Sequence, residues 1–472
     1  MQTLLKKNDQ VEITIEDMGS EGEGIGKYQG YTLFVKDTVI GDHALVQVTK
    51  TGKTYGYARL VKLITSSGFR AEPRCPIAAR CGGCQLMHVD YKKQLEYKEN
   101  KVRNCLTRIG GFSDFYMEPI SGMEEPYYYR NKSQFPVGRN KDGSIAIGFY
   151  AGRTHSIIDT RHCHIGAEIN EDILAFMRSF IEKYKIESYD EESHKGLLRH
   201  ILIRAGFNTG EIMVCLVING TALPHSDELV KGLCQIKGMA SICLNINKGK
   251  TNVILGDKVV TLWGAAYITD KIGSVMYRIS PLSFYQVNPV QTKKLYDIAL
   301  DYADLQGDEV VWDLYCGIGT ISLFLAGKAK QVYGVEIIPQ AIEDARTNAR
   351  INNITNAEFY AGAAEEVLPR MYKEENIRAD VIVVDPPRKG CEQSLLDTIL
   401  TMAPKKVVYV SCDPATLARD LKYLCEKGYE LVKVRAVDQF CHTTHVECVV
   451  LMSRVEMLKY RHPNVDGILR ME

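Results

Sequence analysis

The pattern of apolar and polar positions changes twice along the 472 residues. In residues 1–66, apolar and polar residues alternate in short runs that Gly22, Gly24 and Gly26 interrupt. Short alternating runs with glycine-rich turns are typical of strands with one buried face, so this segment is predicted to form a small OB-like β-barrel. Its eight basic and eight acidic residues give no net charge, which leaves a structural cap as the alternative role.

Residues 67–283 mix the two periodicities. Two hairpins are expected, one turning at Asp142–Gly143 and one near Asn208–Gly210, because turn residues separate strand-like runs there. Residues 166–184 have the spacing of an amphipathic helix. This segment is therefore predicted to be an α+β domain.

From residue 284 to residue 472, nearly continuous apolar runs alternate with helical patterns. The strand candidates are EVVWDLY, QVYGVEI, AEFYA, DVIVV, KKVVYVS and ECVVLM. Strands that are apolar on both sides and alternate with helices are typical of a parallel sheet covered on both faces. The third domain is therefore predicted to be a doubly wound, Rossmann-like α/β domain.

Composition excludes some classes of protein. The 58 basic and 58 acidic residues exclude a histone-like protein that binds polyanions by bulk charge. Residues 74–110 nevertheless hold eight basic and three acidic residues, partly on a helix whose apolar side is expected to carry Leu95, Val102, Leu106 and Ile109. Either this is a solvated helix face, or its lysines contact phosphates. The candidate phosphate contacts are Lys92, Lys93, Lys101, Arg130, Lys132 and Arg139.

The chain has no run of apolar residues long enough for a signal peptide or a membrane span. A cytoplasmic, monomeric protein is expected. Its fourteen cysteines are too sparse for a disulfide scaffold, so clustered ones are expected to bind metal or to catalyse.

A glycine-rich turn, Asp313-Leu-Tyr-Cys-Gly-Ile-Gly319, follows the first strand of the C-terminal domain. Such a turn lets a ligand approach backbone N–H groups. The next strand ends at Glu336, where a carboxylate can accept hydrogen bonds from two ribose hydroxyls. Because Ser322 replaces the third glycine of the dinucleotide fingerprint, the pattern favours a nucleoside without a pyrophosphate, such as S-adenosylmethionine.

Three further polar side chains lie next to strands of this domain. Asp385 follows DVIVV, Cys412 follows KVVYVS, and Glu447 precedes CVVLM. Because ligands bind beyond the carboxyl ends of parallel strands, Asp385 is expected to face the same crevice as the glycine-rich turn. A thiol beside a helix N-terminus is expected to favour the thiolate, so Cys412 is a candidate nucleophile, with a buried core cysteine as the alternative.

Together these segments resemble the uracil-5 methyltransferases of RNA. The motifs occur in the family's order: SPLSFYQVN at 280–288, DLYCGIGT at 313–320, VDPPRKG at 384–390, SCDPATLARD at 411–420 and HTTHVE at 442–447. The resemblance covers residues 284–454. The N-terminal barrel is similar to the TRAM domain, which many members that act on large-subunit ribosomal RNA carry.

The resemblance implies a role for each matching residue. Cys412 would be the nucleophile and Glu447 the base. The residues that would line the S-adenosylmethionine and substrate pocket are Gln286, Tyr315, Gly317, Glu336 and Asp385. Gln286 would serve either the cofactor or the uracil edge.

These groups fit the chemistry that the resemblance implies. Carbon 5 of uracil is a poor nucleophile, but a thiolate that adds to carbon 6 turns the ring into an enolate whose carbon 5 can attack a methyl sulfonium. A base then removes the proton from carbon 5, and the thiolate leaves. Since the target atom is stacked inside duplex RNA, the uridine must be single-stranded or flipped out.

Three cysteines cluster at Cys75, Cys81 and Cys84, and Cys163 is a candidate fourth ligand. Such a set can hold a four-iron, four-sulfur cluster or a zinc ion, with His162 or His164 as further zinc ligands. The resemblance favours the iron–sulfur cluster. No step of the methyl transfer needs an electron, so a structural role is expected.

Other functions fit part of the sequence. A transfer RNA uracil methyltransferase would share the catalytic motifs, although by resemblance those enzymes lack the barrel and the four cysteines. A non-catalytic RNA-binding factor would lack Cys412 or Glu447, and an iron–sulfur redox enzyme would need another cysteine spacing. The sequence predicts an S-adenosylmethionine-dependent enzyme that methylates carbon 5 of uridine in 23S ribosomal RNA.

Overall fold

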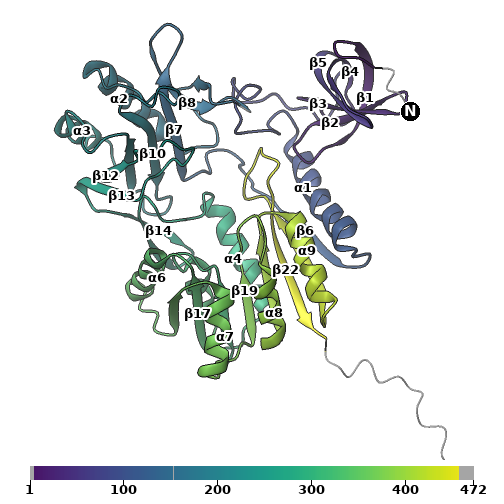
Figure 1. Ribbon diagram of the computed structural model, residues 1–472, viewed down its shortest axis with the longest axis vertical. Helices are drawn as coiled ribbons and strands as arrows, with labels where there is room; N and C mark the ends of the chain where they lie inside the picture. Colours follow the sequence, from purple (N-terminus) through teal and green to yellow (C-terminus); the bar gives the residue numbers. More distant parts are fainter. Residues whose placement is uncertain (1–4, 153, 456–472) are drawn as a thin grey trace, which may run out of the picture. The chain divides into compact units, whose positions relative to one another are not determined.

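The computed structural model describes residues 5–152 and 154–455 (Figure 1). Its contacts define two compact units. The first unit comprises residues 1–101, 120–294 and 437–446, and the second comprises residues 102–119, 295–436 and 447–472. The three expected domains, 1–66, 67–283 and 284–472, remain a proposal, and residues 1–4 and 456–472 of them lie outside the described part.

The N-terminal segment forms the expected barrel. Its strands are β1 (Gln10–Met18), β2 (Gly24–Tyr28), β3 (Tyr31–Lys36), β4 (His43–Thr51) and β5 (Tyr55–Thr65), closed in the order β1-β2-β3-β5-β4. The inward positions of the alternation, such as Ile13, Leu33 and Val46, make its core. Gly24 is needed because a Cβ there would lie 2.2 Å from the hydroxyl of Thr38.

The neutral charge of the barrel hides two segregated groups. Residues 9–23 hold six acidic and no basic residues, whereas residues 27–62 hold six basic and two acidic ones. One of the latter two, Asp42, is fully buried and paired with Arg70. The barrel is therefore polarised, with its positive charge concentrated on β2 to β5.

The central part of the first unit is built on a seven-stranded sheet in the order β13-β12-β11-β10-β7-β8-β9. The strands are β7 (Lys132–Arg139), β8 (Ile145–Tyr150), β9 (Ile157–Asp159), β10 (Leu198–Ala205), β11 (Ile212–Ile218), β12 (Met239–Ile246) and β13 (Lys258–Gly264). The hairpins β7–β8 and β10–β11 form as predicted. A separate hairpin, β14 (Ile268–Ile272) with β15 (Val275–Ile279), follows the sheet.

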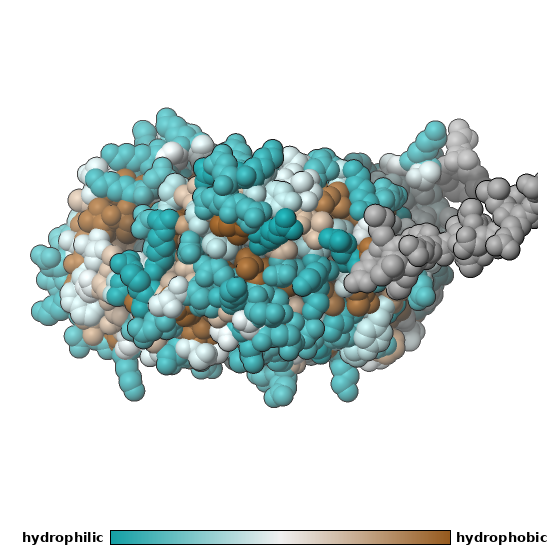
Figure 2. Space-filling model, turned by 90° about the horizontal axis from the view of Figure 1, so that it is seen from below, coloured by the Kyte–Doolittle hydropathy of each residue, from teal (hydrophilic) through white to brown (hydrophobic). Residues whose placement is uncertain are grey.

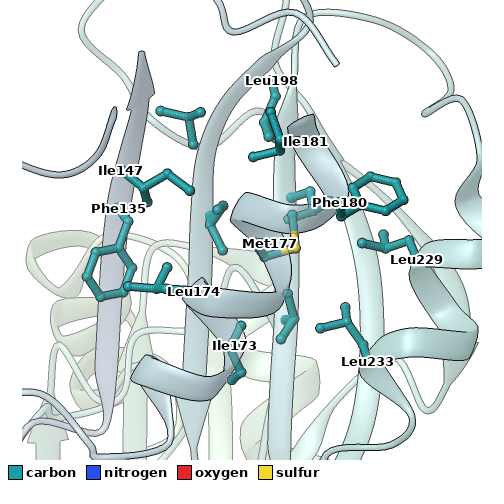
Figure 3. Packing of buried hydrophobic residues seen from close by; sticks show 14 of the residues in the cluster. Phe135, Ile147, Ile173, Leu174, Met177, Phe180, Ile181, Leu198, Leu229 and Leu233 are labelled. Atoms are coloured by element: carbon teal, nitrogen blue, oxygen red, sulfur yellow. The ribbon is translucent and has the colours of Figure 1, made fainter. Parts of the chain in front are cut away.

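Helices α2 (Asn170–Lys183) and α3 (Ser226–Leu233) pack on this sheet. The apolar side of α2, with Met177 and Phe180, meets Phe135 of β7 in one buried cluster (Figure 3). The predicted helix over residues 166–184 therefore forms because burying this side stabilises it.

The basic segment forms α1 (Tyr91–Cys105), which continues as a π-helical turn, η1 (Leu106–Gly110). Its charges differ from the predicted free basic face. Lys98 is fully buried and forms an ion pair with Asp438, 340 residues away. Lys101 donates hydrogen bonds to the carbonyl oxygens of Ser20 and Thr444 at 3.2 and 3.0 Å. Thus part of the predicted phosphate-binding surface is used inside the first unit.

Lys93 pairs with Glu96 at 2.5 Å, and its predicted contact with phosphates stays a prediction. One other prediction for this segment is wrong. Ile109, expected on the apolar side, is 45% exposed in the π-helical turn, because the change of helical repeat turns it out of register with Leu106.

The C-terminal segments form an eight-stranded sheet in the order β18-β17-β16-β19-β20-β22-β21-β6. Its strands are β16 (Val310–Leu314), β17 (Gln331–Glu336), β18 (Ala357–Ala361), β19 (Val381–Val384), β20 (Lys406–Ser411), β21 (Tyr429–Val437), β22 (Glu447–Arg454) and β6 (Tyr116–Ser121). The helices are α4 (Pro289–Ala303), α5 (Thr320–Ala326), α6 (Pro339–Ile351), α7 (Ala364–Glu374), α8 (Gln393–Met402) and α9 (Pro414–Cys425).

This is the predicted doubly wound α/β domain, with one correction. Strands β16 to β20 are parallel, but β22 pairs with β20 in the antiparallel direction. Glu447, at the start of β22, therefore lies at the same edge of the sheet as the carboxyl ends of the parallel strands. The strand order reverses between β16 and β19, and ligands bind at such a switch point in open α/β sheets.

The surface carries scattered apolar side chains. The face in Figure 2 is mostly hydrophilic, with separate hydrophobic patches between the polar side chains. Among the described residues, no helix combines the length and the hydropathy that a membrane span requires.

The buried pair of Lys98 and Asp438 gives the first prediction. Lys98→Met should lower the free energy of unfolding by about 3–5 kcal/mol, because it leaves the carboxylate of Asp438 buried without its cation. Urea denaturation measures this change. The control, Lys92→Met, removes an exposed lysine of the same helix and should change stability by less than about 0.5 kcal/mol. Equal urea midpoints for the two variants would contradict the role of the pair.

Candidate active site

The turn after β16 is built from left-handed residues. Tyr315, Gly317 and Gly319 have φ angles of 67°, 55° and 80°. A positive φ at a tyrosine costs free energy, and such strain is concentrated at functional sites. These left-handed backbone conformations allow the turn to close tightly beyond the end of β16.

Glu336, at the end of β17, is fixed by this turn. Its carboxylate accepts hydrogen bonds from the N–H of Gly317 at 3.2 Å and from the N–H of Ile338 at 3.1 Å. The exposed side chains of Ile337 and Ile338 follow it. A carboxylate held in this way beside an apolar surface fits the ribose and the base of a nucleoside.

Asp313, the last polar residue inside β16, is fully buried. Its Oδ2 accepts the hydroxyl proton of Ser322, and its Oδ1 has no hydrogen-bond partner among the described residues. Burial raises the pKa of Asp313 to about 7. Ser322, which replaces the third glycine of the dinucleotide fingerprint, therefore serves a buried carboxylate.

The structure brings Cys412, Glu447 and Asp385 together at this edge of the sheet. Burial and the negative charges of Glu447 and Asp385 raise the pKa of the Cys412 thiol to about 12. Burial and the charge of Asp385 raise the pKa of Glu447 to about 8. Burial raises the pKa of Asp385 to about 7. Arg388 opposes the shifts of Cys412 and Glu447.

The expectation of a stabilised Cys412 thiolate is wrong for the protein without ligands. Asp413 occupies the N-terminus of α9, where its carboxylate accepts the N–H groups of Ala415 and Thr416 at 2.9 and 3.1 Å. The helix N–H groups thus stabilise this carboxylate rather than the thiolate, and the buried carboxylates nearby oppose the thiolate.

The motifs around Cys412 and Asp385 are clamped to each other. The carboxylate of Asp420 on α9 accepts the N–H of Cys391 at 2.8 Å and the hydroxyl of Tyr409 at 2.7 Å. Gly390, with a φ of 78°, lies so close that a Cβ would be 2.5 Å from Asp420. The glycine of VDPPRKG and the final aspartate of SCDPATLARD are therefore needed for one close contact.

Sequence reasoning missed several residues of this site. Arg388 received no role, although its positive charge opposes the raised pKa of the Cys412 thiol, and Asp313 received none although its carboxyl group is fully buried. Asp420 and Tyr409 were missed because their contact with the 385–391 loop is a tertiary one. A buried acidic residue in the middle of an apolar strand was the available signal for Asp313.

Gln286 lies in the first unit, after β15. Its side chain is 7% exposed, and its backbone oxygen accepts a hydrogen bond from Asn131 at 2.9 Å. Phe284, two residues earlier, is 67% exposed. Tyr315, in the second unit, is half-buried, and Cys391 and Glu365 are among its electrostatic neighbours.

The four candidate metal ligands also meet in the first unit. Cys75, Cys84 and Cys163 pack against one apolar cluster that contains Tyr129 and Cys441. Burial is the largest cause of the raised pKa values of Cys81, Cys84 and Cys163, and neighbouring thiols add to each of these shifts. Backbone N–H groups of Gly83, and of Ile165 and Gly166, approach the sulfurs of Cys81 and Cys163.

Metal binding by these cysteines, as a cluster or as a single zinc ion, stays a prediction. A zinc ion with bonds of about 2.3 Å would bring its sulfur ligands within roughly 4 Å of one another. In the described part of the chain, no three cysteine, histidine or acidic side chains are arranged to share one metal ion. A four-iron cluster holds its thiolates farther apart and is stabilised by N–H groups that point at the sulfurs.

Comparison with known proteins gives consistent matches. The family model described as tRNA (Uracil-5-)-methyltransferase matches residues 90–455, and the TRAM domain model matches residues 5–61. A protein of Clostridium tetani named an uncharacterized RNA methyltransferase is 51% identical over 450 residues, which are 95% of this chain and 97% of that protein. A Bacillus cereus protein of the same name is 51% identical over 453 residues, which are 96% of this chain and 98% of that protein.

One solved structure matches nearly the whole chain. It is the tRNA (uracil-54, C5)-methyltransferase of Pyrococcus abyssi in complex with S-adenosyl-L-homocysteine. The TM-score is 0.76 at 29% sequence identity, and the match covers 93% of this chain and 99% of that one.

The charges around Cys412 predict its reactivity in the protein without ligands. Its alkylation by iodoacetamide should be slow at pH 7 and rise with pH, because the thiol pKa is about 12. At pH 9, Glu447→Gln should speed alkylation about three- to tenfold, because it removes a negative charge that raises the thiol pKa. At pH 6 it should have little effect, since Glu447, with a pKa of about 8, is already neutral.

Arg388→Gln is the matched variant with the opposite sign. It removes the positive charge and should slow alkylation at pH 9. Mass spectrometry of the peptide that contains Cys412 separates this thiol from the other thirteen cysteines. Equal rates for both variants and the unmodified protein would refute the electrostatic description of the site.

Proposed function

Because the chain belongs to the uracil-5 methyltransferase family of RNA-modifying enzymes, we propose that it transfers a methyl group from S-adenosylmethionine to carbon 5 of uridine in 23S ribosomal RNA. The proposal rests on one observation. Cys412, Glu447 and Asp385 lie close together at the edge of the sheet where the glycine-rich turn of residues 313–319 also lies.

The residues that would hold the cofactor are those of the turn and the adjacent strand ends. Glu336 would accept the two ribose hydroxyls, with Gly317 closing the turn beside it. Tyr315 and Asp385 would line the same pocket. When bound, the cofactor supplies an electrophilic methyl group on a positively charged sulfur.

The protein side chains would supply the covalent chemistry. The thiol of Cys412 would lose its proton to water, and its sulfur would then form a bond to carbon 6 of the uracil, which makes carbon 5 nucleophilic. After carbon 5 has taken the methyl group, the carboxylate of Glu447 removes its proton. The bond between carbon 6 and the sulfur then breaks, which restores the ring and the thiolate.

Transfer RNA is the second candidate substrate. The Pyrococcus abyssi enzyme is a tRNA methyltransferase. Because its match covers 93% of this chain, it must include at least part of the barrel. The barrel is thus no argument against a tRNA substrate. Ribosomal RNA remains the first proposal because, by resemblance, the transfer RNA enzymes lack the four cysteines Cys75, Cys81, Cys84 and Cys163.

A basic and aromatic face of the barrel would contact the RNA. The rings of Phe34, Tyr55 and Tyr57 lie 5.6–5.8 Å apart on the outer side of β3 and β5. Lys36 pairs in register with Arg59 beside them. Exposed rings flanked by cations are suited to stack unpaired bases and to contact phosphates. This face would replace the basic helix as the main phosphate-tracking surface.

Cys75, Cys81, Cys84 and Cys163 would hold a four-iron, four-sulfur cluster. Their apolar packing, the N–H groups directed at two of the sulfurs, and Arg130 nearby suit an anionic cluster. Burial raises the pKa values of Cys84 and Cys163, and Arg130 opposes part of this shift. Tying residues 75–84 to residue 163 would stabilise the first unit.

The covalent mechanism predicts a trapped complex. Glu447→Gln should attack the RNA, transfer the methyl group and then stall, because the proton on carbon 5 is no longer removed. A denaturing gel should show a protein–RNA band that carries label from the methyl group of S-adenosylmethionine. 23S ribosomal RNA and tRNA transcripts without 5-methyluridine are offered separately, and we expect the band with 23S RNA.

The controls separate the parts of this proposal. Cys412→Ala should give no band with either RNA, whereas Cys234→Ala, which changes a thiol beside α3, should retain it. A labelled band with tRNA alone would show that tRNA, the second candidate, is the substrate. A band that survives Cys412→Ala would refute the assignment of the nucleophile.

The cluster proposal predicts the metal content. Protein purified without oxygen should contain about four irons per chain and absorb visible light. Cys163→Ser should lower the iron content and the thermal stability, while Cys234→Ser should leave both unchanged. One zinc per chain without visible absorbance would exclude the cluster.

A further inference from the structure

A chain of side-chain hydrogen bonds in the first unit ends at Gln286. The Nε2 of Gln439 lies 2.8 Å from the hydroxyl oxygen of Thr292 and 3.5 Å from the Oε1 of Gln286. Gln439 and Thr292 are fully buried, and Gln286 is 7% exposed. Of these three residues, Gln286 alone has surface exposed to solvent.

The direction of each bond in this chain is determined. The hydroxyl of Thr292 donates its single proton to the carbonyl oxygen of Asn288 at 2.6 Å. Its oxygen can therefore only accept, so the amide of Gln439 must present its NH₂ group. The same NH₂ group faces Gln286, so Gln286 must turn its Oε1 toward Gln439 and its own Nε2 away.

The orientation of the Gln439 amide costs free energy that a freely rotating amide would avoid. Among the described residues, the buried Oε1 of Gln439 has no hydrogen-bond partner. An unsatisfied buried acceptor costs roughly 1–3 kcal/mol. Turning the amide over would place this oxygen against the oxygen of Thr292, which is worse. The orientation is therefore enforced, and no described residue accepts a hydrogen bond from the Nε2 of Gln286.

The backbones of both glutamines are also fixed. Asn131 donates to the carbonyl oxygen of Gln286 at 2.9 Å, and Asn288 donates to that of Gln439 at 3.1 Å. The remaining freedom in Gln286 is rotation of its side chain, and Gln439 restrains it. The two amides thus form one preorganised unit.

This restraint bears on the choice between pyrimidines. Uracil presents an accepting oxygen at position 4, where cytosine presents a donating amino group. A glutamine that can turn its amide over pairs with either base, whereas one held by its oxygen offers only a donor. We propose that Gln439, itself oriented by Thr292, fixes the amide of Gln286 so that it donates to a uracil oxygen and rejects cytosine. The proposal rests on the function proposed above, with Gln286 serving the uracil edge.

The test compares RNAs that differ only in the target base, 5-fluorouridine or 5-fluorocytidine. The rate of covalent adduct formation is measured for each, and the ratio is the discrimination. Thr292→Val, which removes the accepting oxygen at nearly constant volume, and Gln439→Met should each lower the ratio about tenfold, the value of one hydrogen bond. Thr292→Ser keeps the hydroxyl and should keep the ratio.

If Gln439 and Thr292 had only a structural role, their substitution would slow the formation of both adducts equally and leave the ratio unchanged. An unchanged ratio, whatever its cause, would overturn the proposal. If 5-fluorocytidine gives no adduct with any variant, a double-mutant cycle decides. In a Gln286→Ala background, Gln439→Met should not slow the 5-fluorouridine adduct further, because Gln439 acts through Gln286. Additive losses would overturn the proposal. Absence of any adduct with the unmodified protein would instead refute the proposed function.

Discussion

The structure of the second unit depends on the cost of placing negative charge at one edge of its sheet. Asp313, Asp385, Glu447 and the thiol of Cys412 are removed from water there, and all four pKa values are raised. Each group that ionises raises the pKa of its neighbours. The four groups therefore cannot all carry charge in the protein alone. A fold that keeps these four groups together must offset the free-energy cost of burying them with other stabilising contacts.

Rigid contacts hold these groups in position, and Arg388 offsets part of the raised pKa values of Cys412 and Glu447. Asp420 joins α9 to the loop after β19 by accepting hydrogen bonds from Cys391 and Tyr409, and Arg419 pairs with it. Gly390 allows this contact because no other residue fits so close to Asp420. Asp413 takes the N–H groups of α9 that would otherwise stabilise a thiolate. The clamp thus holds the reactive groups in position while leaving their charges unsatisfied, as a site that waits for a ligand requires.

The parts that sequence predicted are those encoded within a few residues. Alternation, helical spacing and turn residues located the barrel, both hairpins and the strands that carry Asp385 and Cys412. The failures concern partners far apart in the chain. The burial of Lys98 depends on Asp438, and the raised pKa of Cys412 depends on carboxylates from two other strands. The antiparallel direction of β22 is likewise a property of the sheet and not of the segment ECVVLM. No local pattern contains this information, because the interacting residues meet only after folding.

The raised pKa values also imply an order of charge changes in the reaction. In the proposed reaction, attack on carbon 6 would require a thiolate at Cys412, and removal of the proton from carbon 5 would require a carboxylate at Glu447. Near pH 7 both groups are largely protonated in the protein alone, since their pKa values are about 12 and about 8. A positive charge brought to this edge lowers the pKa values of all the acidic groups there, and Arg388 already acts in that direction. A methyl sulfonium is such a charge, so binding it would favour ionisation of the thiol at the moment when its nucleophilicity is useful.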